Sequence, residues 1–155
     1  KRFTYWPQLF LGITFNYGLL LGWTSIKGQI DLAPILFYLG AIFWTLGYDT
    51  IYGYQDIKDD EIIGLKSTSI KFKGNAKKFL FICYTLLIVL FLLGGHNMQF
   101  QNSFYFLIII PFIHLFFYQI KKFNFNDPSI CLKIFKSNNF FGLIIFIKIL
   151  IIKNL

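Results

Sequence analysis

Five long apolar runs, separated by short polar segments, constrain the fold of this chain more than any other feature. They cover residues 8–25, 32–54, 79–95, 103–120 and 138–152. Most approach the roughly 20 residues that an α-helix needs to cross a bilayer, and none alternates as the strands of a membrane β-barrel do. The mean hydropathy of +0.60, with 14% charged residues, excludes an ordinary soluble domain. The sequence therefore predicts an all-α integral membrane protein with about five transmembrane helices in a lipid bilayer.

Basic residues predict the orientation of these helices. Five crossings place residues 1–7, 55–78 and 121–137 on one side, and nearly all Lys and Arg residues lie there. Such an excess in short loops marks the cytoplasmic side in bacteria or the matrix side in an organelle. The predicted location is the bacterial inner (plasma) membrane or, as the alternative, the mitochondrial inner membrane. Because these loops hold the basic excess behind the net charge of +8, orientation explains it better than nucleic-acid binding does.

The acidic residues gather where the second apolar run ends. Five of the seven lie between residues 49 and 61. If the helix continues past the apolar run, 100° per residue brings Asp49, Asp56 and Asp60 within about 40° of one another. Asp59 and Glu61 would then point away to the flanks. Like charges at this spacing repel, so the stripe is unfavourable unless a cation lies against it.

The chemistry of that stripe indicates a metal site. Mg²⁺ characteristically takes one or two protein carboxylates and fills its other positions with water and phosphate oxygens. The aspartates therefore predict a Mg²⁺ site for a diphosphate, to which Lys66, Lys71 and Lys73 would add positive charge. The alternative is a solvated cap on a transmembrane helix. Asp49 favours the metal site, because an acid set back toward the apolar run should face a cavity or a partner.

Three short motifs in this region carry a resemblance to a known family. They are YDT at residues 48–50, DIKDD at 56–60 and GLKST at 64–68. Together they resemble the second aspartate-rich motif of the UbiA superfamily of membrane prenyltransferases. The opening KRFT with Pro7-Gln8, and the segment 131–142, resemble further parts of the same family. Residues 1–155 are similar, in order, to the C-terminal part of a single nine-helix UbiA-type domain.

The resemblance implies an activity and a set of site residues. The family members most similar to this chain transfer a polyprenyl group from polyprenyl diphosphate to 4-hydroxybenzoate, with Mg²⁺, in ubiquinone biosynthesis. Asp56 and Asp60 match the metal–diphosphate ligands, and Asp49 is a third candidate for binding metal and substrate. Arg2 matches an active-site arginine, and Lys66 matches a residue placed to contact the diphosphate.

The sequence departs from the family in one respect. It has no counterpart of the family's first aspartate-rich motif, NDxxDxxxD in outline, and it has fewer than nine apolar runs. The resemblance therefore implies a missing N-terminal half of the same enzyme, without which this chain is not expected to catalyse. A truncated record, one half of a split gene and a decayed gene all stay open. So do a UbiA-type enzyme with another aromatic acceptor and a non-enzymatic membrane subunit or transporter half.

Other residues in or near the apolar runs are predicted to be structural. Asn16, His114, Asn138 and Asn139 are expected to join helices by hydrogen bonds. The two cysteines have no metal-ligand spacing and predict neither a disulfide nor a catalytic thiol. The tyrosines beside the acids either stabilise positive charge through their ring faces or form an interfacial aromatic belt. These tyrosines are Tyr48, Tyr52 and Tyr54.

Overall fold

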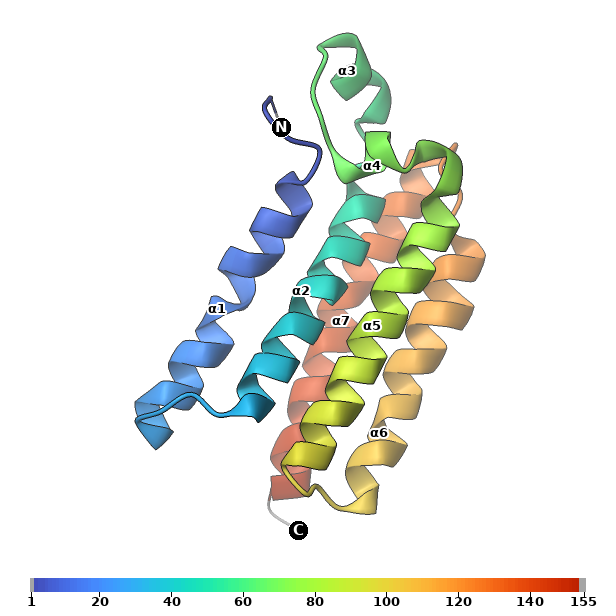
Figure 1. Ribbon diagram of the computed structural model, residues 1–155. Helices are drawn as coiled ribbons and strands as arrows, with labels where there is room; N and C mark the ends of the chain where they lie inside the picture. The colour runs from blue at the N-terminus through green and yellow to red at the C-terminus, as the bar shows by residue number, and fades with distance from the viewer. Residues whose placement is uncertain (1, 154–155) are drawn as a thin grey trace.

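The computed structural model describes residues 2–153, apart from the side chains of residues 145 and 148–153. All regular secondary structure in this range is helical (Figure 1). In chain order the helices are α1 (Pro7–Lys27), α2 (Leu32–Tyr52), α3 (Ile57–Ile62), α4 (Thr68–Lys71), the 3₁₀-helix η1 (Lys73–Asn75), α5 (Ala76–Asn97), α6 (Asn102–Phe112), the π-helix η2 (Ile113–Ile120) and α7 (Pro128–Lys153).

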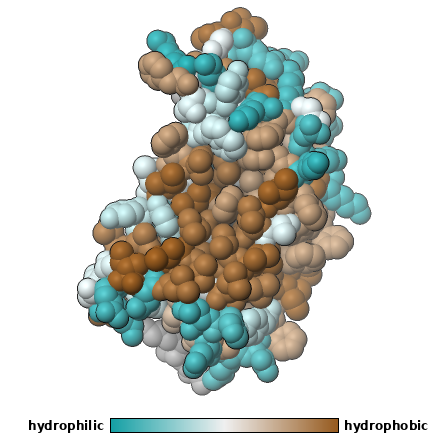
Figure 2. Space-filling view, in the orientation of Figure 1, coloured by the Kyte–Doolittle hydropathy of each residue, from teal (hydrophilic) through white to brown (hydrophobic). Residues whose placement is uncertain are grey.

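Length and composition confirm a membrane-spanning bundle. Four helical spans in the described residues are long and apolar enough to cross a membrane: α1, α2, η1 with α5, and α6 with η2. The fifth predicted run lies within α7, which has 26 residues and lies in the bundle with the other long helices (Figure 1). Figure 2 shows a broad band of apolar side chains over the middle of the bundle, with polar residues gathered beyond it at both ends.

The central helix is α2, which packs against α1, α5 and α7. Ten of its 21 residues are buried, whereas α1 has the same length and buries two. Two glycines of α2 let α5 approach closely. A methyl group at Gly40 would lie 2.7 Å from the ring of Phe91, and one at Gly47 would overlap the ring of Tyr84. Small residues at a helix interface have this effect in membrane proteins generally.

The two ends of the bundle differ in charge. The start of α1, the α3–α4 segment and the loop after η2 lie at one end, which we call the basic end, and the loops at 28–31 and 98–101 lie at the other (Figure 1). This arrangement confirms that the three predicted basic segments share one end, although residues 128–137 of the third segment, with Lys133 and Lys136, belong to α7. Arg and Lys residues of the basic end that the structure describes are Arg2, Lys58, Lys66, Lys71, Lys73, Lys77, Lys78, Lys121 and Lys122.

The predicted continuation of α2 through the acidic stretch is wrong. The helix ends at Tyr52, and a separate six-residue helix, α3, begins at Ile57. Asp49 therefore does not share one helical stripe with Asp56 and Asp60.

The reason for the break is a hydrogen bond from a distant serine. In a continuing helix the Thr50 carbonyl would accept from the N–H of residue 54. Instead it accepts from the Ser69 hydroxyl at 2.7 Å, and the Tyr54 N–H turns to the Ile51 carbonyl at 3.2 Å. Gly53 makes this possible, because a Cβ there would overlap the Ser69 hydroxyl oxygen.

The end of α3 is fixed by a glycine. The Leu65 N–H donates to the Asp60 carbonyl at 2.8 Å and the Gly64 N–H donates to the Glu61 carbonyl at 3.1 Å. This pair of bonds is a Schellman motif, which requires a left-handed residue at its centre. Gly64 has φ +74° and supplies it.

The start of α7 also differs from the prediction. The last apolar run was expected from residue 138, but the helix begins at Pro128. The Asp127 carboxylate accepts hydrogen bonds from the N–H groups of Ser129 at 3.0 Å and Ile130 at 3.1 Å. An N-cap aspartate followed by proline starts a helix whether or not the next residues are apolar.

Replacing Gly64 with alanine should destabilise the protein through its backbone. No heavy atom lies within 4 Å of a Cβ built there, so the left-handed φ is the sole cost, about 1 kcal/mol of unfolding free energy. Gly74→Ala is the matched control, since that glycine is equally uncrowded and has no left-handed φ. Thermal unfolding in detergent measures both. An equal effect of the two substitutions would contradict the Schellman motif.

Removal of the Asp127 cap should loosen the start of α7. Hydrogen bonds from Ser129 and Ile130 lower the pKa of the Asp127 carboxyl. The ionised cap therefore stabilises the fold at neutral pH, and this contribution disappears as the pH falls below the ordinary aspartate range. Asp127→Ala should lower the thermal midpoint at pH 7, whereas Asp127→Asn, which keeps an accepting oxygen, should retain most of it. A midpoint in Asp127→Ala equal to the wild type would refute the cap.

Candidate functional site

The acid pair of α3 lies at the basic end of the bundle. Asp56 directly precedes α3 and is exposed, while Asp60 is 6% exposed. The Asp60 N–H donates to the Asp56 carbonyl at 2.8 Å, so the two residues are one helical turn apart. Asp59 and Glu61 are exposed, as predicted for the flanks. The pair therefore combines one carboxylate shielded from water with one open to it.

The other predicted site residues lie at the same end. Asp49 is half-buried in the last turn of α2, and Arg2 is exposed just before α1. Lys66 is half-buried in the turn between α3 and α4, and its Nζ lies 5.6 Å from the centre of the Tyr5 ring. Lys73 has a partner, since its Nζ lies 2.8 Å from the Glu61 carboxylate. Three candidates, Asp56, Asp60 and Lys66, thus belong to one continuous segment.

The donor set fits part of a magnesium–diphosphate site. Within residues 2–153 no three His, Cys, Asp or Glu side chains form a group that could hold a metal ion. The expected cluster of Asp49, Asp56 and Asp60 is therefore not assembled. The pair Asp56 and Asp60 could supply the one or two carboxylates that Mg²⁺ usually takes from a protein, which would leave positions for phosphate oxygens.

Two buried hydrogen-bond donors directly precede Asp56. In the part of the chain that the structure describes, the Tyr54 hydroxyl and the Gln55 side-chain nitrogen have no hydrogen-bond partner. Burial raises the pKa of Tyr54, so its hydroxyl stays protonated and remains a donor. Unpaired buried donors are costly and suit an oxygen-rich ligand or ordered water nearby.

The turn after α3 is held by buried hydroxyls. Thr68 is fully buried, and its N–H donates to the Gln8 side-chain oxygen at 3.1 Å. Its hydroxyl lies 2.6 Å from the Thr50 hydroxyl. Because Thr50 donates its one hydroxyl proton to the Leu46 carbonyl at 2.6 Å, Thr68 must be the donor between the two threonines. The turn that carries Lys66 is thereby fastened to both α1 and α2.

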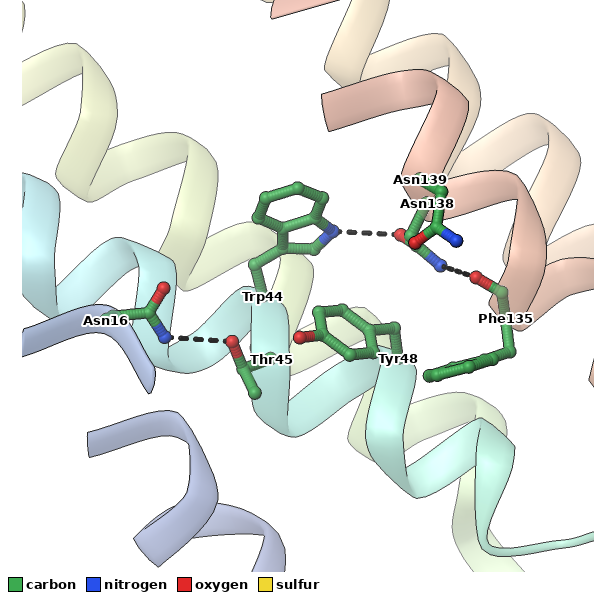
Figure 3. Close-up of a pocket in the computed structure, with 7 residues that line it drawn as sticks. All are labelled: Asn16, Trp44, Thr45, Tyr48, Phe135, Asn138 and Asn139. Atoms are coloured by element: carbon green, nitrogen blue, oxygen red, sulfur yellow. Dashed lines mark hydrogen bonds between the residues drawn. The ribbon is translucent and has the colours of Figure 1, made fainter. Parts of the chain in front are cut away.

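A pocket of about 160 Å³ lies deeper in the bundle, between α1, α2 and α7 (Figure 3). Its lining has no charged side chain and combines three aromatic rings with amide and hydroxyl groups. The lining residues are Asn16, Trp44, Thr45, Tyr48, Phe135, Asn138 and Asn139.

Aromatic rings connect this pocket with the basic end. Trp44, Tyr48 and Tyr52 are spaced four residues apart and share one face of α2. Ring centroids are 5.7 Å apart for Trp44 and Tyr48, and Phe135 of α7 lies 5.8 Å from Tyr48 and 4.5 Å from Tyr52. We call these four residues the aromatic row. It extends from the pocket to the point where α2 gives way to the acidic segment.

A chain of buried amides fixes the wall of the pocket. The Asn138 side-chain oxygen accepts from the Trp44 indole and from the Gln119 amide, both at 2.9 Å. Gln119 in turn accepts from the Tyr84 hydroxyl at 2.5 Å. Asn16 donates to the Thr45 hydroxyl at 2.9 Å. The predicted joining roles of Asn16 and Asn138 are confirmed.

Two other structural expectations also have clear outcomes. Ser137 and the His114 ring nitrogen are 3.2 Å apart, and the His114 ring stacks on Phe141, so this histidine packs α7 against η2 as predicted. Cys83 and Cys131 are both free thiols, as expected. Asn139 is exposed at the edge of the pocket.

Sequence reasoning missed several buried polar residues that join the helices. Gln8 and Gln119 are both buried, and a glutamine within an apolar run is the signal that could have pointed to them. Thr50 and Thr68 gave no such signal, because threonine is common in helices and turns alike.

Comparison with known proteins is consistent with this architecture. The UbiA prenyltransferase family matches residues 1–145. The chain is 44% identical over 152 residues to the mitochondrial 4-hydroxybenzoate polyprenyltransferase of Bos taurus, and 41% identical over the same length to that of Homo sapiens. It is 42% identical over 147 residues to that of Arabidopsis thaliana.

The alignments cover nearly all of this chain and a smaller part of each relative. They include 97% of the chain and 41% of the bovine and human proteins, and 94% of the chain and 36% of the plant protein. No solved structure matches. Since the family match extends over residues 1–145, this chain belongs to the UbiA prenyltransferase family.

Proposed function

We propose that residues 1–155 form the C-terminal part of a single UbiA-type domain that transfers a polyprenyl group from polyprenyl diphosphate to 4-hydroxybenzoate. The observation that carries this proposal is the pair Asp56 and Asp60, one turn apart at the basic end of a membrane bundle. The names of the relatives support the acceptor and favour the mitochondrial inner membrane over the bacterial one. An N-terminal half carrying the first aspartate-rich motif would complete the site.

The acid pair, through a bound metal ion, and the neighbouring cationic side chains would bind the diphosphate. Prenyltransferases of this family generally use a divalent metal. Asp56 and Asp60 would hold Mg²⁺, and the bound ion would neutralise charge on the departing diphosphate. Because Asp60 is buried, its charge is screened less by water than that of an exposed carboxylate. Arg2 and Lys66 would direct positive charge toward the remaining phosphate oxygens.

The aromatic row suits the reacting end of the prenyl group. As the allylic carbon–oxygen bond breaks, positive charge develops on the carbon chain. The ring faces of Tyr48 and Tyr52 would stabilise that charge by on the order of 2 kcal/mol when water is excluded. The ring carbon of 4-hydroxybenzoate next to the hydroxyl then forms the new carbon–carbon bond and loses its proton. The uncharged pocket beneath would accommodate the part of the apolar chain nearest the reacting carbon and keep water from the cation.

Removing either carboxylate of the pair should abolish prenyl transfer. The assay uses membranes containing a chimera in which this chain replaces the matching segment of the bovine relative. Asp56→Asn and Asp60→Asn should each lower turnover on the order of 100-fold or more, because lost metal binding removes several kcal/mol of charge stabilisation. Asp59→Asn, on the same short helix and exposed, is the matched control and should keep its activity.

Two results of this assay would contradict the proposal, one for the metal site and one for the acceptor. Unchanged turnover in either Asp56→Asn or Asp60→Asn, with normal expression, would refute the metal assignment. Full activity with an aromatic acceptor from another pathway, and none with 4-hydroxybenzoate, would place the chain elsewhere in the family.

A further inference from the structure

The start of α1 contacts the segment that follows the acid pair at three points. The Gln8 side-chain oxygen accepts from the Thr68 N–H at 3.1 Å. The Tyr5 ring lies beneath the Lys66 ammonium at 5.6 Å, and the Trp6 ring lies beneath the Lys71 ammonium at 4.4 Å. Residues 5–8, at and just before the start of α1, thus contact both ends and the middle of residues 66–71.

We infer that Gln8 is a positioning residue for the diphosphate site, an inference that rests on the proposed function. Thr68 is the first residue of α4, so its N–H has no partner within that helix. The Ser67 hydroxyl caps the Ile70 N–H at 3.3 Å and leaves the Thr68 N–H to another acceptor. Gln8, which is 3% exposed, supplies that acceptor from a helix 60 positions earlier in the chain.

The acid-bearing helix depends on this attachment because it is short. Six residues are too few for a helix to be stable alone in water, so external contacts set the orientation of α3. One contact is Ile57, which is buried, and another is the ion pair of Glu61 with Lys73 at 2.8 Å. The next fixed point along the chain is Thr68, two residues after Lys66. Without the Gln8 oxygen the buried Thr68 N–H would lack a partner, and the segment would have to move to reach water.

The packing of α1 against α2 fixes the position of Gln8. One helical turn further along α1, a Cβ at Gly12 would lie 3.1 Å from the Ile42 carbonyl oxygen, so the two helices are in backbone contact there. Another turn on, Asn16 bonds Thr45 at 2.9 Å. Close packing therefore sets the position of Gln8 relative to α2. Gln8 in turn fixes the position of the loop that carries Lys66.

The test compares two buried glutamines of this chain within the same chimera that is used for the prenyl-transfer assay, reconstituted in lipid nanodiscs. Gln8→Ala removes the acceptor of Thr68, and Gln119→Ala removes the acceptor of Tyr84 away from the acid pair. Calorimetry measures Mg²⁺-dependent binding of inorganic pyrophosphate, and hydrogen exchange follows the amides of residues 64–71. Gln8→Ala should weaken pyrophosphate binding roughly tenfold and accelerate exchange in that segment. Gln119→Ala should lower thermal stability and leave both readouts unchanged.

A conservative variant and two contrary outcomes complete the design. Gln8→Glu keeps a side-chain oxygen at the same chain length and should restore slow exchange at residues 64–71. If Gln8→Ala binds pyrophosphate as the wild type does and loses only stability, Gln8 is a packing residue and the inference fails. If the wild type itself does not bind Mg²⁺ and pyrophosphate while exchange still depends on Gln8, the proposed function fails and the positioning role fails with it.

Discussion

The hydrogen bonds between the α3–α4 turn and the last turn of α2 determine the arrangement of the charged end of this protein. Ser69 takes the carbonyl of Thr50 that a longer helix would have used, so α2 stops at Tyr52. The chain then turns and presents a short acidic helix beside the helix ends. Thr68 ties the same turn to α1 through Gln8. Three segments far apart in the sequence thereby share one set of buried polar groups, which must all be paired.

The long helices could be predicted because burial in lipid requires whole turns of apolar residues. Helix ends were predicted less well, since hydrogen bonds rather than hydropathy decide them. The pair Asp127 and Pro128 is visible in the sequence as a turn, yet the same two residues start α7 by capping it. At the end of α2 the decisive partner is Ser69, and no local pattern shows which carbonyl a serine that far along the chain will bind.

Charge predicted that the candidate site residues lie at one end of the bundle, because acids and lysines are costly among lipid chains. The sequence did not predict the separation of Asp49 from the acid pair, which follows from the break after Tyr52. Nor did it predict which side chains hold the acidic segment in place. Gln8 and Thr68 are 60 positions apart, and their contact depends on the packing of α1 against α2. Charge and periodicity can be recognised in neighbouring residues of the sequence. The contacts that position a segment depend on the tertiary structure.

The shared acceptor on Asn138 has a consequence for the order of membrane assembly. The indole of Trp44 and the amide of Gln119 both donate to this one oxygen, which belongs to the last helix of the chain. Because α2 and η2 precede α7 in the chain, both donors are synthesised before the acceptor that pairs them. Rotating α7 by one residue, or 100°, would turn Asn138 away from both. By accepting from both, α7 therefore fixes the rotational setting of two helices that precede it in the chain.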